Sequence, residues 1–185
     1  MSYDALAESV RLLEGAELPA VVRLSRRVRH VPLAVDRDGD VAVTVFLRRG
    51  VSGLPLVESH TLELARGGWR VLGGGGGASD VAVAPRQSLA ELGAPAVSPG
   101  SGGTARSRSG LLGLRSGWIS YAELWLAREV AVLQVGNRRL PFAAHGYAVV
   151  VWTGRTPEIT ARDAEGKPLG AVELRTPRRM PPFYA

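Results

Sequence analysis

The chain has 185 residues, of which 45% are hydrophobic and 22% charged, with a formal net charge of +6 and no cysteine. This composition is typical of a folded protein with one or two domains, and it argues against wholesale disorder. The lack of cysteine excludes a disulfide scaffold, a thiolate zinc site and a cysteine nucleophile.

Residues 3–14 predict a short amphipathic helix. Leu6, Val10 and Leu13 are spaced so that they lie on one face of that helix. Ser2 is a candidate N-terminal cap, and Gly15 is a candidate stop. Residues 19–31 fit a helix or a strand, and we favour a strand from about Val28 onward because it leads into a hairpin.

Residues 33–72 predict a small antiparallel sheet. Strands 33–35 and 41–47 flank Asp38-Gly39, a favoured two-residue turn. A third strand runs from 57 to 65, and Gly67-Gly68 joins it to a fourth at 69–72. If that second turn has two residues, Leu64 lies opposite Val71. We therefore expect 1–72 to form a small α+β domain with a short helix on an antiparallel sheet.

Residues 73–117 predict a linker. Five consecutive glycines occupy 73–77, and 95–117 is rich in proline, serine and glycine. Between them, 87–92 has the pattern of one or two helical turns. Because a compact domain seldom contains so long an irregular segment, we expect a domain boundary here.

Residues 118–185 predict an all-β domain, an immunoglobulin-like sandwich with a proline-rich tail. Gly136-Asn137 is a hairpin turn, and 147–152 is an apolar strand expected to be buried on both faces. A capping-box pattern at Ser120–Glu123 favours a helix over 118–128, whereas alternation favours a strand there with Ile119, Tyr121 and Trp125 on one face. We choose the strand, because the neighbouring segments are all strands and a sandwich needs it.

No cofactor or metal site is expected from the motifs. The glycine run lacks the following helix that a dinucleotide fingerprint requires, because Pro85 soon interrupts a β-like segment. Asp36, Asp38 and Asp40 have the spacing of a calcium loop, but the glycine and the distal acid of that loop are missing. His30, His60 and His145 are far apart in sequence, so local spacing assembles no catalytic site.

Two segments are candidate interaction sites. Arg23, Arg26, Arg27 and Arg29 form the densest basic run; we favour a solvated face neutralised by acidic residues of the first helix over a phosphate-binding stripe. The other segment is the end of the tail, where Phe183 and Tyr184 either dock on the protein itself or bind a partner.

The leading functional hypothesis is a non-enzymatic module that binds a protein partner, since no catalytic constellation is visible. One alternative is an enzyme or small-ligand protein with a site between the two domains, using His60 or His145. A second alternative is weak nucleic-acid binding through Arg23–Arg29. We expect no membrane span and a cytoplasmic location, because no apolar stretch is long enough to cross a membrane and no signal peptide is visible.

Overall fold

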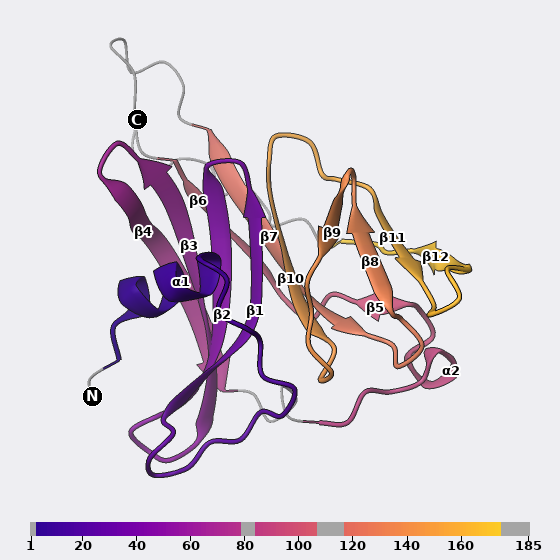
Figure 1. Cartoon of the computed structure of the whole chain (residues 1–185), viewed down its shortest axis with the longest axis horizontal. Coiled ribbons are helices and arrows are strands. Elements are labelled where there is room, and N and C mark those ends of the chain that lie inside the picture. The colour runs from indigo at the N-terminus through magenta and orange to yellow at the C-terminus, as the bar shows by residue number, and fades with distance from the viewer. Residues whose placement is uncertain (1–2, 79–83, 107–116, 175–185) are drawn as a thin grey trace.

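The computed structural model describes residues 3–78, 84–106 and 117–174, and antiparallel strands make up most of it (Figure 1). The elements in chain order are α1 (Ala5–Leu13), β1 (His30–Asp38), β2 (Val41–Arg49), β3 (Pro55–Ala65), β4 (Gly68–Ala78), α2 (Leu89–Leu92), β5 (Ala96–Val97), β6 (Ser101–Ala105), β7 (Trp118–Leu126), β8 (Val132–Val135), β9 (Arg138–Leu140), β10 (Tyr147–Thr153), β11 (Ile159–Arg162) and β12 (Pro168–Ala171).

The predicted N-terminal helix is confirmed as α1, but its cap and its buried face differ from the expectation. Asp4 caps it, because its carboxylate accepts the Leu6 and Ala7 N–H groups at 3.0 and 3.1 Å. Ser2 lies outside the described residues. The helix buries Ser9 and Leu12, whereas Leu6 is exposed. Ser9 accounts for this buried face, because its hydroxyl lies 2.7 Å from that of Thr44 on β2 and forms a hydrogen bond with it.

The predicted N-terminal sheet is confirmed, with the strand order β1-β2-β3-β4. The first turn is Gly39-Asp40, one residue later than expected, because Asp38 pairs with Val41. The turn between β3 and β4 is Arg66-Gly67, and this change places Leu64 opposite Trp69 rather than Val71. The positive φ of Gly68, 113°, fits it to the first position after that turn.

The irregular linker predicted from Gly73 is wrong at its start. Gly73–Gly77 belong to β4, and each of these glycines pairs with a residue of β3. A strand is held by backbone hydrogen bonds, so an absence of side chains does not prevent its formation. Elements α2, β5 and β6 also lie within 73–117. The division of the chain into two domains stays a prediction.

β7 and β10 form a ribbon that is buried on both faces (Figure 1). The predicted strand over 118–128 is therefore confirmed, as is the doubly buried strand at 147–152. Tyr147, Val149 and Val151 pack against the β1–β4 sheet, in a cluster that also contains Leu33 and Val45. Residues from both halves of the chain thus share one hydrophobic cluster.

The opposite face of the β7–β10 ribbon packs against a third sheet with the order β12-β11-β8-β9. Ala148, Val150 and Trp152 lie in this second cluster. The Gly136-Asn137 turn is confirmed, since Val135 pairs with Arg138. These β-rich layers do not confirm an immunoglobulin-like sandwich. Among the described residues, no helix has the length and apolar character needed to cross a membrane.

Candidate functional site

The exposed half of β4 is the candidate site, and it is unusual in having no side chains for most of its length. Gly74–Ala78 are all exposed, and β4 lies at the edge of its sheet, paired through β3 alone among the described strands (Figure 1). Natural sheets normally protect such an edge with charged residues, proline or a bulge, because its free backbone groups can pair with another strand. The glycine run of β4 carries no charged residue and no proline, and the bulge in β4 lies just before the run, at Leu72.

Two of these glycines are required by the close approach of β3. A Cβ atom at Gly74 would lie 2.7 Å from the carbonyl oxygen of Ser59, and one at Gly76 would lie 2.6 Å from that of Val57. Both distances are shorter than normal contacts with Cβ atoms. Gly77, in contrast, has open space around the position of a Cβ atom. Gly74 and Gly76 must therefore be glycine because β3 leaves no room for a side chain, whereas a side chain at position 77 would fit.

A cavity of about 430 Å³ lies along this bare backbone, and we call it the glycine trough. The residues lining it are Arg48 from β2, Leu56–Glu58 and His60 from β3, and Gly74–Gly77 from β4. Glu58 pairs with Gly76 and His60 with Gly74, so the register of β3 and β4 sets these two side chains beside the glycines. The trough thus combines exposed backbone with one cation, one carboxylate and one imidazole.

Tyr3, which precedes α1, contacts two of the side chains that line the trough. Its hydroxyl is 2.8 Å from Nε2 of His60, and the Arg48 guanidinium lies 4.1 Å from the centre of its ring. Arg48 also forms an ion pair with Glu58. Tyr3, His30, Phe46 and His60 form a connected group of aromatic rings, with centroids 5.0 to 6.1 Å apart. This packing fixes the side chains that border the trough.

The hydrogen-bonded pair of His60 and Tyr3 is neutral near pH 7. Burial lowers the pKa of His60, although the nearby Glu58 opposes that effect. Burial also raises the pKa of Tyr3, and Glu58 adds to the increase. The nearest serine, Ser59, is engaged on the other side of the sheet, where its hydroxyl lies 2.8 Å from that of Tyr121. The trough is therefore equipped to bind polar groups, but it lacks an activated nucleophile among its described residues.

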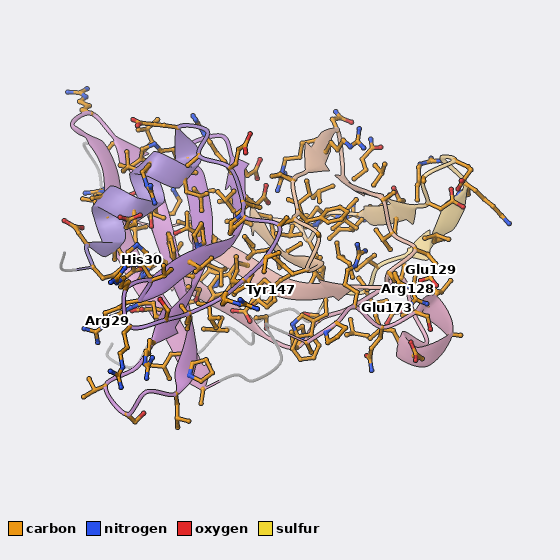
Figure 2. The ribbon with its side chains drawn as sticks, turned by 60° about the horizontal axis from the view of Figure 1, so that its bottom comes forward. Arg29, His30, Arg128, Glu129, Tyr147 and Glu173 are labelled. Atoms are coloured by element: carbon orange, nitrogen blue, oxygen red, sulfur yellow. The ribbon has the colours of Figure 1, made fainter. Side chains whose placement is uncertain are left out.

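The structure separates the other predicted residues from the trough. Arg23, Arg26, Arg27 and Arg29 lie in the segment between α1 and β1, and all four are exposed. The expected neutralisation by the helix is not found: among the described residues, Glu8 pairs with Arg11 and His30 instead. Figure 2 shows Arg29 and His30 in the N-terminal half of the structure.

His60 is brought to the trough, whereas His145 lines a separate cavity beside Trp125. Phe183 and Tyr184 lie outside the described residues. Sequence reasoning missed Tyr3, Arg48 and Glu58, because each comes from a different element. The alternation of Glu58 and His60 in one strand was the only local signal that both face the same way.

In comparisons with known proteins, the chain matches no family model, no curated protein and no solved structure.

Proposed function

We propose that this chain is a non-enzymatic protein-binding module that holds an extended segment of a partner along the free edge of β4. One observation carries the proposal: Gly74–Ala78 are an exposed edge without charged or bulky side chains. Addition of a strand to such an edge is a common mode of peptide recognition, in which backbone hydrogen bonds give affinity and alternate side chains give specificity.

The glycine trough supplies the specificity in this arrangement. Alternate side chains of an added strand point to the same face of the sheet, so every second side chain of the partner reaches the trough. There the Arg48–Glu58 pair offers one charge of each sign, and both side chains are about one-third exposed, at 33% and 31%. A partner segment that carries a polar side chain at this position is therefore favoured.

Selection from a displayed library of random peptides tests the proposal without knowledge of the natural partner. A selected peptide is expected to perturb the backbone amide resonances of β4 most strongly. Gly77→Lys should weaken its binding by about tenfold or more, because a charged side chain on an edge opposes strand addition. Gly67→Lys is the matched control, since a Cβ atom there also meets open space, at the turn rather than along the free edge.

Three results would refute this function. These are the failure of repeated selections to yield a binding peptide, equal binding of the selected peptide to Gly77→Lys and the wild type, and perturbations centred away from β4. Circular dichroism of both lysine variants is needed to show that each is folded.

A second candidate function, nucleic-acid binding, is favoured by the four exposed arginines of the segment between α1 and β1. Within the described part of the chain, none of them forms an ion pair that would neutralise it. If they bind phosphates, the affinity for DNA falls steeply as salt is raised, and Arg26→Gln with Arg27→Gln reduces that slope. A salt-independent affinity would eliminate this candidate. The immunoglobulin-like arrangement of 118–185 and the cytoplasmic location also stay proposals.

A further inference from the structure

A second cavity, of about 260 Å³, lies away from the glycine trough, between the segment after β4 and the β7–β10 ribbon. Its walls come from Ala84–Gln87, Leu92, Trp125-Leu126 and His145–Tyr147. Figure 2 shows Tyr147 in the middle of the molecule, between the N-terminal and C-terminal halves. The sequence analysis left open the alternative that the chain binds a small ligand, and this cavity is a candidate site for one. It shares no residue with the glycine trough.

Two buried polar atoms without a hydrogen-bond partner among the described residues belong to side chains that line this cavity. They are Nε1 of Trp125 and Nε2 of His145, whereas the Tyr147 hydroxyl interacts with the carboxylate of Glu123. Tyr147 is only 3% exposed, and it is the cross-strand partner of Trp125, so both side chains lie on one face of the ribbon. Buried polar groups are nearly always satisfied, and two exceptions beside one cavity indicate a place for a polar ligand.

Both nitrogen atoms are hydrogen-bond donors. The indole nitrogen of Trp125 can only donate. Nδ1 of His145 accepts the backbone N–H of Tyr147 at 3.1 Å, which leaves the proton of the neutral ring on Nε2. Burial lowers the pKa of His145, and the positive charge of Arg86 lowers it further, so the neutral ring is the form present near pH 7. A ligand for this pair must therefore bring acceptor atoms.

Arg86 makes the histidine side of the cavity electropositive. Its guanidinium is held in place by the carbonyl oxygens of Leu126 at 3.3 Å and Val130 at 2.8 Å, and by that of Ala127. Gly146 allows this placement, because a Cβ atom there would lie 2.5 Å from Nε of Arg86. A fixed cation beside two donors favours an anionic acceptor.

The remaining charges near the cavity define where the anion sits. Glu123 raises the pKa of Tyr147, as burial does more strongly, and its carboxylate would repel a second one on that side. Glu129 accepts the backbone N–H of Leu89 at 2.8 Å, and its charge favours the protonated form of Arg86, whose pKa burial lowers. The histidine side is therefore the end that suits a negative group, and the apolar wall at Leu92 and Pro85 suits a short hydrocarbon part.

We propose that this cavity binds a small organic carboxylate, whose oxygen atoms accept the N–H groups of Trp125 and His145 beside Arg86. The volume limits the ligand to a small molecule, since pockets for drug-sized ligands begin at about 300 Å³.

Indole N–H resonances of protein labelled with ¹⁵N test this assignment directly, with sodium propionate as the probe and sodium chloride as the ionic-strength control. Propionate is expected to shift the Trp125 resonance, which Trp125→Phe identifies by its disappearance. His145 resonances should shift in the same titration. In Trp125→Phe, propionate affinity measured on His145 should fall by about tenfold, in line with the loss of one charge-assisted hydrogen bond.

Trp118→Phe is the matched control, because Nε1 of Trp118 is also buried and unpartnered among the described residues but lies outside this cavity. It should leave propionate binding unchanged. Propionamide, which has the same shape without the charge, should bind much more weakly. The proposal is overturned if propionate shifts neither Trp125 nor His145, if propionamide binds as well as propionate, or if Trp118→Phe weakens binding as much as Trp125→Phe.

Discussion

Asp36 and Arg138 lie 102 positions apart in the sequence and form a two-pronged ion pair between β1 and β9. Nε of Arg138 donates to Oδ1 of Asp36 at 3.1 Å, and Nη2 donates to Oδ2 at 2.7 Å. The same carboxylate accepts the backbone N–H of Val151 at 2.8 Å. The Asp36 side chain is only 3% exposed. One buried carboxylate thus connects the N-terminal sheet to two strands of the C-terminal half.

Arg138→Gln is expected to destabilise the protein strongly. It leaves the charge of Asp36 buried with backbone partners alone, and removal of one member of a buried pair costs about 3–5 kcal/mol. Urea denaturation measures the free energy of unfolding. Arg139→Gln is the control, because Arg139 is the next residue of β9 and its side chain is exposed. A loss no larger than that of Arg139→Gln would show that the pair contributes little to the link between the halves.

Alanine substitutions along β4 should divide into two classes. Gly74→Ala and Gly76→Ala place a Cβ atom against a backbone carbonyl oxygen of β3, and such overpacking costs about 1–3 kcal/mol. Gly77→Ala meets open space, so it should be neutral or stabilising by about 0.5–1 kcal/mol through reduced freedom of the unfolded chain. Midpoints of urea unfolding distinguish the classes. Equal effects at 76 and 77 would contradict the register of β3 and β4.

His60 should make stability depend on pH. Because burial places its pKa in the folded protein below the ordinary value of 6.5, the unfolded chain binds the proton more readily. The stability contributed by neutral His60 is therefore complete above pH 6.5, the ordinary pKa, and it is lost as the pH falls through the lower pKa of the folded protein. His60→Gln should reduce this loss in unfolding titrations below neutral pH. His145 titrates in the same direction, so part of the slope should remain. An unchanged slope would contradict the burial of His60.

The hydroxyl pair beneath α1 offers a double-mutant cycle. Ser9→Ala leaves the hydroxyl of Thr44 buried without its partner, and the expected cost is about 1–3 kcal/mol. Adding Thr44→Val removes both polar groups, so the double variant should be less destabilised than the two single losses predict. Additive losses in urea denaturation would show that the two side chains do not interact.

The parts of the fold that the sequence predicted correctly have local signals. The existence of α1 follows from the spacing of its apolar residues, although the face that it buries does not. The turn at Gly136-Asn137 follows from residues that tolerate positive φ, which is 55° at Gly136. The ribbon strand 147–152 follows from a short continuous apolar run. In each case the information lies within a few neighbouring residues.

The glycine strand and the trough lack such signals. Strand patterns are carried by side chains, so five glycines look the same in a tether and in β4. The trough needs Arg48 from β2 and His60 from β3, which the register of the sheet brings together, and Tyr3 reaches both through side-chain contacts. The second cavity has the same origin, because Arg86 and His145 meet through packing rather than through spacing.

The glycine composition of β4 also has a consequence for the order of folding. Glycine loses more backbone freedom on ordering than any other residue, and five in succession contribute no apolar side chains in return. Native-state hydrogen exchange should therefore find this segment opening by a local event, at a lower free energy than the β7–β10 ribbon. We expect β1, β2 and β3 to form the sheet first. The glycine run of β4 should pair with β3 last and separate from it first.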